Sequence, residues 1–404
     1  MENGAAKNME VIGYNDLEGR PSLKIAMQVV NDRWYVYTAH FWSPGWSIVD
    51  VTDPTKPEYV QHVPGPANTE TCQVQVADNL MVTNLERMIP LPGRADTSDQ
   101  PNEEGIYIWD VKDPVHPKRL GHFKTGGGGT HRNYWDGGRY VHLSASVRGF
   151  KGNIYLIVDI ADPANPVEVG RWWLPEQWEA GGANWTKPRV HFHGPAYIVG
   201  DRAYLGYGGG GMVILDIFDL TLPRLVSSLE FSPPFNDRLP CHTVLPLPKR
   251  KLALVDSEAI AEECQEPLNI AGIVDISDEE KPRLISLLPL PEPPPGVPYK
   301  NFGEKGGRFG PHNFHQAQNQ PHFENRDDRI YLTYFNAGLR IYDISDPYLP
   351  KEIAYFVPPD PKEKIGILPR NKLAVQSEDV IVDTRGYIYM THKNQGVYIL
   401  RCTV

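Results

Sequence analysis

The chain has 404 residues, enough for two or three average domains or for one large all-β domain. Its 41% apolar and 22% charged residues are ordinary for a globular protein, and its net charge of −10 without a basic stripe excludes nucleic acid and anionic membranes as expected partners. The 36 glycines and 38 prolines favour short strands joined by turns.

The cysteines are scattered along the chain and form no C-x-x-C pair, so we expect reduced thiols rather than a disulfide framework. Residues 1–4 do not begin a signal peptide, and no apolar run approaches the roughly 20 residues that a transmembrane helix needs. The sequence therefore predicts a soluble, cytoplasmic protein that acts on a small molecule.

One short pattern recurs along the chain: an apolar, β-branched strand ends in aspartate, and a second aspartate and a proline follow. The first copy is Ile48-Val49-Asp50-Val51 with Asp53-Pro54. Proline presets φ in such a turn, and aspartate bonds the backbone. In five further copies the strand aspartates are Asp110, Asp159, Asp216, Asp275 and Asp343.

The spacing of these copies leaves room for four strands in each unit, which describes a β-propeller blade. A seventh unit, at residues 397–400, stops after its third strand, whereas residues 9–14 resemble a fourth strand. We therefore predict an all-β fold in which residues 1–404 form a single seven-bladed β-propeller domain, its last blade closed by the N-terminal strand 9–14. An open solenoid and two separate domains are the alternatives, and neither explains the two complementary ends.

The copies resemble the LVIVD-repeat family of β-propeller proteins, and the resemblance covers essentially the whole chain. Membership of that family implies the propeller fold. It implies little about chemistry, because propellers support many unrelated activities.

Histidines recur at the predicted start of the innermost strand. A fixed count back from the second strand of each unit locates this position, although His131 falls one residue short of the count. An enlarged loop interrupts the count in the sixth unit and leaves both His312 and His315 as candidates. Because inner strands converge on the axis, we expect the seven positions to lie close together: Lys24, Glu70, His131, His193, His242, His312 or His315, and Glu378.

Four neighbouring imidazoles predict a bound divalent transition metal, with iron first and zinc, manganese or copper as alternatives. Glu70 and Glu378 would complete the ligand set or orient the histidines through their second nitrogens. A metal-free polar funnel is the competing interpretation. His191 is a weaker choice than His193 for the fourth unit.

Loops that follow the second strands should open on the same face. Glu258 and Glu86 are candidates for a general base, His40 and His392 for proton transfer, and Arg148 for holding an anionic group. Taken singly, each of these side chains also fits an ordinary solvated loop residue.

A long connection over residues 172–187 carries Trp178 and Trp185. Long connections in compact folds often serve as lids or binding loops. We expect the two indoles to roof the mouth of the channel and, with Tyr207 and Lys24, to contact an apolar or aromatic substrate.

The predicted layout is similar to that of the carotenoid-cleaving non-haem iron oxygenases and of the selenium-binding/methanethiol oxidase propellers, although no linear motif is shared. The resemblance implies oxygenase or oxidase chemistry at a mononuclear site at the top of the central channel. One alternative is a zinc or manganese lyase or hydrolase in which Glu258 or His40 moves a proton. A non-catalytic propeller that binds a protein or peptide is the other.

Overall fold

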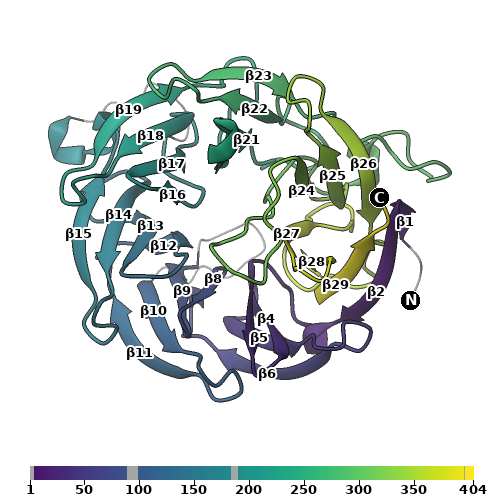
Figure 1. The fold of residues 1–404 in the computed structure, drawn as a ribbon, viewed down its shortest axis with the longest axis horizontal. Helices are drawn as coiled ribbons and strands as arrows, with labels where there is room; N and C mark the ends of the chain where they lie inside the picture. The colour runs from purple at the N-terminus through teal and green to yellow at the C-terminus, as the bar shows by residue number, and fades with distance from the viewer. Residues whose placement is uncertain (1–3, 89–98, 183–189, 395) are drawn as a thin grey trace.

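The computed structural model describes residues 4–88, 99–182, 190–394 and 396–404. Strands dominate these ranges and form six antiparallel sheets, which are arranged around a common axis (Figure 1). The fold is an all-β propeller. Within the described ranges, no helix combines the length and the apolar character needed to cross a membrane.

Strands follow chain order from the axis outward in three of the sheets and within each half of a larger fourth sheet, whereas the last two sheets end in N-terminal strands. Three sheets have four consecutive strands: β3 (Ile25–Val30), β4 (Arg33–Ala39), β5 (Gly45–Asp50) and β6 (Glu58–Pro64); β16 (Tyr197–Val199), β17 (Arg202–Gly206), β18 (Met212–Asp216) and β19 (Arg224–Leu229); β20 (Thr243–Leu247), β21 (Leu252–Asp256), β22 (Ala271–Asp275) and β23 (Arg283–Leu287).

A fourth sheet has nine strands, because β9 also pairs with β12 through Glu86 and Gly129. Its members are β7 (Thr69–Glu70), β8 (Val74–Ala77), β9 (Leu80–Arg87), β10 (Gly105–Asp110), β11 (Lys118–Phe123), β12 (Gly129–Tyr134), β13 (Tyr140–Ser146), β14 (Asn153–Asp159) and β15 (Val167–Trp172). The helices are single turns: η1 (Leu17–Gly19), η2 (Pro175–Gln177), η3 (Glu179–Gly181), η4 (Pro248–Arg250) and α1 (Phe302–Lys305).

The N-terminal segment adds outer strands to the last two sheets. β1 (Ala5–Lys7) pairs with β26, and β2 (Met9–Asn15) pairs with β29, with Met9 opposite Cys402. The remaining strands of these sheets are β24 (Arg329–Thr333), β25 (Leu339–Asp343) and β26 (Lys351–Val357), then β27 (Ser377–Val382), β28 (Tyr387–His392) and β29 (Gly396–Cys402).

The recurring aspartates build the turns as their sequence pattern predicts. Asp50 Oδ1 accepts the N–H of Thr52 at 2.9 Å, and Asp53 Oδ1 accepts the N–H of Thr55 at 3.0 Å. The same two bonds occur in each of the five other copies. Each aspartate thus bonds a backbone group two residues on, and this local chemistry fixes the sharp reversal after each third strand.

Hydrophobic side chains fill the spaces between neighbouring sheets. In one cluster, Leu254 and Ile273 of one sheet pack against Ile330 and Leu332 of the next. Since successive strand residues point to opposite faces, a strand that is apolar at every position buries both faces. This packing brings the starts of the inner strands from different sheets close to one another.

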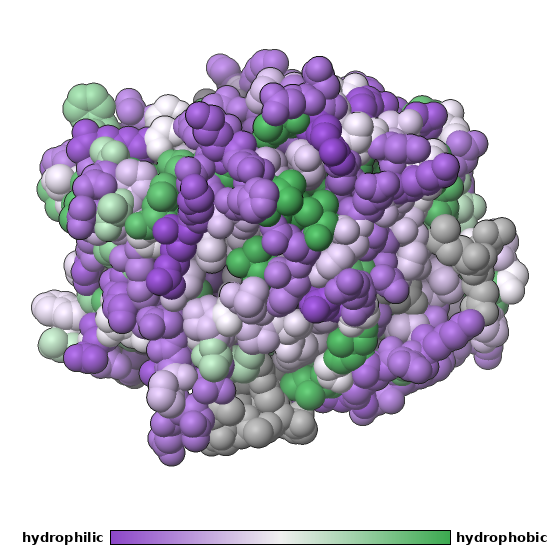
Figure 2. All heavy atoms as spheres, turned by 90° about the horizontal axis from the view of Figure 1, so that it is seen from below, coloured by the Kyte–Doolittle hydropathy of each residue, from purple (hydrophilic) through white to green (hydrophobic). Residues whose placement is uncertain are grey.

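Apolar side chains also remain on the outer turns. Phe218 is 80% exposed, and Tyr348 and Leu349 are each 65% exposed. On the face drawn in Figure 2, apolar residues gather in small patches that polar residues separate. Scattered exposure of this kind is usual for a soluble protein surface.

Candidate metal centre

Four histidines from four different inner segments meet near the axis. His131 belongs to β12, His193 and His242 come just before β16 and β20, and His312 bonds Thr333 of β24 through its backbone. Successive ring centroids lie 4.3, 5.2 and 5.1 Å apart. The sequence left His312 and His315 as alternatives, and the structure places His312 in the cluster.

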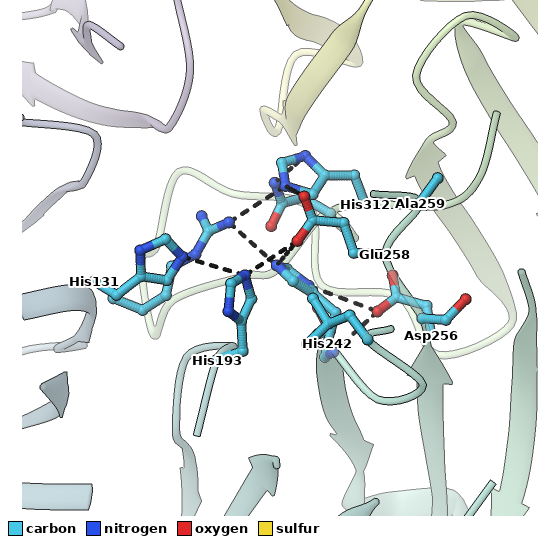
Figure 3. A network of polar contacts seen from close by, with 12 residues as sticks. His131, His193, His242, Asp256, Glu258, Ala259 and His312 are labelled. Atoms are coloured by element: carbon cyan, nitrogen blue, oxygen red, sulfur yellow. Dashed lines mark hydrogen bonds and ion pairs between the residues drawn. The ribbon is translucent and has the colours of Figure 1, made fainter. Parts of the chain in front are cut away.

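Glu258 lies beside three of these imidazoles, those of His193, His242 and His312 (Figure 3). Its Oε2 atom is 3.1 Å from His193 Nε2 and 3.8 Å from His242 Nε2, and its Oε1 atom is 4.0 Å from His312 Nε2. Arg308 Nη1 donates to Oε1 at 2.9 Å and holds the carboxylate in place. The sequence predicted Glu258 as a general base, whereas its position is among the potential ligands.

The Nδ1 atoms of His131 and His312 form hydrogen bonds on the side of each ring that faces away from the cluster. His131 Nδ1 lies 2.8 Å from Glu86 Oε2, and His312 Nδ1 lies 2.8 Å from the carbonyl oxygen of Glu378. Because a carboxylate and a carbonyl only accept hydrogen bonds, both Nδ1 atoms carry the proton. The Nε2 lone pairs of His131 and His312 therefore point into the cluster, in the orientation that metal-ligating histidines require.

Burial keeps the imidazoles of His193, His242 and His312 neutral. It lowers the pKa of His193 to about 4, with a further contribution from His131, and it lowers the pKa of His242 and His312 well below their usual range. Burial opposes ionisation of Glu258, but the hydrogen bond from His193 holds the pKa of this carboxyl well below its usual range. Neutral imidazole beside an ionised carboxylate is a suitable donor set for a divalent metal.

The spacing of the donor atoms fits a single ion. His193, His242 and Glu258 each offer one ligand atom, and these atoms lie within 4.8 Å of one another. Ligand atoms bound at about 2.1 Å in tetrahedral directions are about 3.4 Å apart. The pair distances of 3.1 Å (His193 to Glu258), 3.8 Å (His242 to Glu258) and 3.2 Å (His131 to His193, Nε2 to Nε2) lie close to that value.

Arg132, like Arg308, is a residue of this cluster to which sequence reasoning gave no role. Its Nη2 donates to His242 Nε2 at 3.1 Å and to His312 Nε2 at 3.3 Å. A β-bulge explains its position: Thr130 pairs with Ala145 and Arg132 with Ser144, so that His131 is an extra residue. Bulges re-aim side chains, and this one brings consecutive residues of a strand to the same site.

Two predicted carboxylate ligands and Lys24 lie around the cluster instead of inside it. Glu378 Oε1 is 2.9 Å from Lys393 Nζ, and Glu70 is buried in β7 opposite Glu86 of β9. Lys24 Nζ bonds Asp379 Oδ1 at 3.1 Å. The backbone carbonyl of Glu378 thus bonds His312 Nδ1 on the side that faces away from the cluster, and Lys24 forms a buried ion pair with Asp379.

His315 lies outside the cluster. Its Nε2 donates to the carbonyl of Glu324 at 2.8 Å, and its Nδ1 accepts the N–H of Val382 at 3.1 Å. Its backbone bonds Tyr331, which lies two residues before Thr333, the partner of His312, in β24. Displacement toward the other end of the inner strands accounts for the separation of these two histidines.

The two histidines predicted for proton transfer are structural. His40 Nδ1 donates to the carbonyl of Pro21 at 2.5 Å, its Nε2 lies 2.7 Å from Ser47 Oγ, and burial lowers its pKa to about 3. His392 is equally buried, and its Nε2 accepts the N–H of Gln376 at 3.0 Å. Burial also lowers the pKa of His392 to about 3, so neither imidazole exchanges protons near pH 7.

Three of the remaining predicted residues, Arg148, Tyr207 and Trp178, also fall outside the cluster. Arg148 follows β13 and lines a surface hollow with Arg87. Tyr207 is buried and donates to Gln177 Oε1 at 2.6 Å. Trp178 is 47% exposed and forms a bridge with Phe150, whereas Trp185 lies outside the described residues.

Comparisons with known proteins identify the repeat and the fold. Residues 149–173, 197–230 and 328–356 match the LVIVD repeat, so the chain carries LVIVD repeats. The β-propeller domain of Myceliophteria thermophila Cps50 (Swd1) is 10% identical and has a TM-score of 0.57 over 97% of this chain and 99% of that one. The computationally designed Ika8 protein is 9% identical, with a TM-score of 0.52 over 96% and 99%. No curated protein sequence matches the chain.

Proposed function

We propose that this chain is a metal-dependent enzyme that binds one divalent transition-metal ion through His193, His242 and Glu258, with His131 as a fourth ligand. The observation that carries the proposal is the convergence of the imidazoles of His193 and His242 on the buried, ionised carboxylate of Glu258. A divalent cation would replace the hydrogen bonds of His193 Nε2 with Glu258 and His131, and the hydrogen bond that His242 Nε2 accepts from Arg132.

The ligand types favour an oxygenase or oxidase. His193, His242 and Glu258 form the set of two histidines and one carboxylate that many non-haem iron oxygenases use, to which His131 would add a fourth ligand, and iron would supply oxygen activation there. Zinc also accepts two histidines and a glutamate, so a lyase or hydrolase is the second candidate. A non-catalytic scaffold is less well supported, because it needs no such donor set near the axis.

The surrounding residues have separate tasks in this proposal. Arg308 fixes Glu258 through Oε1, which leaves Oε2 directed at His193 and His242. Glu86 holds His131 in the tautomer with an open Nε2. Solvent reaches the site at His131 and His193, whose side chains are each 17% exposed.

We also propose that the sheets form a closed ring of seven blades, with the nine-stranded sheet counted as two. The last sheet contacts the first, since Thr391 Oγ1 donates to the carbonyl of Leu23 at 2.6 Å. β2 has the bulge of the other outer strands, at Ile12. Its Gly13 lies so close to the carbonyl of Pro54 that a Cβ would be 2.1 Å from the oxygen, as Gly121 does beside Pro163.

Nested deletions test the closure. Removal of residues 1–7 deletes β1, whereas removal of residues 1–15 also deletes β2 and exposes the edge of β29. An open edge strand promotes aggregation. We expect the longer deletion alone to lower the unfolding midpoint strongly and to aggregate. Equal behaviour of the two variants would argue against closure by β2.

Elemental analysis tests the metal site. Protein purified without added metal should contain one transition-metal ion per chain, and His193→Ala and His242→Ala should lose it while remaining folded. His315→Ala is the matched control, because His315 is partly buried and lies outside the cluster. Metal retained by both cluster variants would refute the site. Iron with oxygen consumption would identify an oxygenase, and zinc with anaerobic turnover would identify a lyase or hydrolase.

A further inference from the structure

We infer that Arg132 is the binding point for a carboxylate group on the substrate, beside the metal. The inference deepens the proposed function, on which it rests, by naming the substrate class as small organic carboxylates. It adds a carboxylate group to the apolar or aromatic ligand that the sequence predicts.

Arg132 is a buried cation without a carboxylate partner. Arg132 is 4% exposed. Among the described residues, no carboxylate oxygen lies within 4.0 Å of its guanidinium nitrogens. Its Nε is buried and makes no hydrogen bond within the described part of the chain. A buried charge with an unused donor is costly unless a ligand supplies the missing anion.

The other buried cations near the inner strands are paired. Lys24 lies 3.1 Å from Asp379, Lys393 lies 2.9 Å from Glu378, and Arg308 lies 2.9 Å from Glu258. The fold therefore supplies carboxylates to neighbouring cations and none to Arg132. This contrast separates Arg132 from a purely structural arginine.

The charge balance of the site also requires an anion when metal is bound. Three cations, Arg132, Arg308 and Lys393, and three carboxylates, Glu86, Glu258 and Glu378, surround the four histidines and cancel one another, and Asp256 lies 3.8 Å from His242 Nδ1. A divalent ion then leaves an excess of at least one positive charge in a largely buried site. An anionic ligand offsets part of this excess, whereas a neutral hydrocarbon does not.

Metal binding would also free the guanidinium for this task. His242 Nε2 is both a ligand atom of the metal group and the acceptor of Arg132 Nη2. Once a metal takes that lone pair, an N–H of Nη2 joins the unused N–H of Nε on one edge of the guanidinium. Such an edge matches the two oxygens of a carboxylate. Metal and carboxylate should therefore strengthen each other's binding.

Cobalt(II)-loaded protein provides the test, because ligands near the ion change its visible absorption. Benzoate is titrated as the probe, with benzamide as its neutral analogue and inorganic phosphate as a second anion. We expect benzoate to shift the cobalt spectrum and benzamide not to. Loss of charge-assisted hydrogen bonds should weaken benzoate binding about ten- to a hundredfold in Arg132→Gln, and less in Arg132→Lys. Arg139→Gln, an exposed arginine of the same sheet, should bind as wild type does.

Several results would overturn the inference. Equal binding of benzoate and benzamide, or undiminished benzoate binding by folded Arg132→Gln, would remove the carboxylate assignment but leave the metal site intact. Tighter, Arg132-dependent binding of phosphate would assign the site to phosphorylated ligands instead. If cobalt fails to bind, the proposed function fails by itself. Calorimetry of benzoate with metal-free wild type and Arg132→Gln then decides the role of Arg132, and equal heats refute it.

Discussion

Replacement of Arg308 by methionine tests how the centre of the site is held. The guanidinium bonds Glu258 Oε1 at 2.9 Å, lies 3.5 Å from Glu378 Oε1 and stacks 3.8 Å from the ring centroid of Phe335. Methionine keeps the contact with Phe335 but removes the charge. Arg308→Met therefore isolates the electrostatic part of this contact.

The expected magnitude follows from which carboxylate loses its partner. Breaking a buried ion pair costs about 3–5 kcal/mol, because one charge remains buried and uncompensated. Glu378 keeps Lys393 at 2.9 Å, so only Glu258 is left without its cation. Protonation of Glu258 limits the penalty, at about 1.4 kcal/mol for each unit that its pKa rises. We expect a loss of about 3 kcal/mol in the free energy of unfolding of the metal-free protein.

Urea unfolding with and without zinc measures this effect. A divalent ion beside Glu258 replaces the missing positive charge, so zinc should stabilise Arg308→Met more than it stabilises wild type. Arg139→Met is the matched control: its pair with Asp159 is solvent-exposed, and its loss should cost about 1 kcal/mol or less. Wild-type stability of Arg308→Met, or equal stabilisation of both proteins by zinc, would refute the reasoning.

Three further changes have defined outcomes. Glu86→Gln should lower the metal affinity about 10- to 100-fold, because it weakens the hydrogen bond that orients His131. Metal titrations measure this effect, and Glu279→Gln, a change on the rim of the propeller, should leave the affinity unchanged. Burial lowers the pKa of His193 to about 4, so between about pH 6.5 and 4 the unfolded chain binds more protons than the folded protein does. The free energy of unfolding should therefore fall as the pH drops through that window. A free energy of unfolding that does not change with pH there would contradict this prediction. A thiol reagent should modify the exposed Cys264 in the native protein and spare Cys241, because burial raises the pKa of the Cys241 thiol well above its usual range. If the Cys264→Ser variant is rapidly modified at Cys241, this part of the core opens.

The repeat was predictable because its chemistry is local. Asp50 and Asp53 bond amides two residues further on, so the turn can be recognised without knowledge of the tertiary structure. Four strands per unit then place His193 and His242 at equivalent positions. Counting along regular strands therefore predicted which histidines meet.

The prediction was incomplete where the backbone leaves the regular pattern. The bulge at His131 directs Arg132 into the cluster, and no feature of the sequence marks that bulge except the count that falls one residue short. The irregular segment before β24 separates His312 from His315. Loop position likewise did not reveal that His40 is fully buried, because its contacts come from other segments of the chain, at Pro21, Ser47 and Thr71.

Anomalous diffraction from crystals of protein purified without added metal tests the central claim most directly. The account predicts one peak, recorded at the absorption edge of the metal found by elemental analysis, within about 2.0–2.2 Å of His193 Nε2, His242 Nε2 and an oxygen of Glu258. Absence of a peak among these three residues, with Arg132 occupying the space between the histidines, would contradict it.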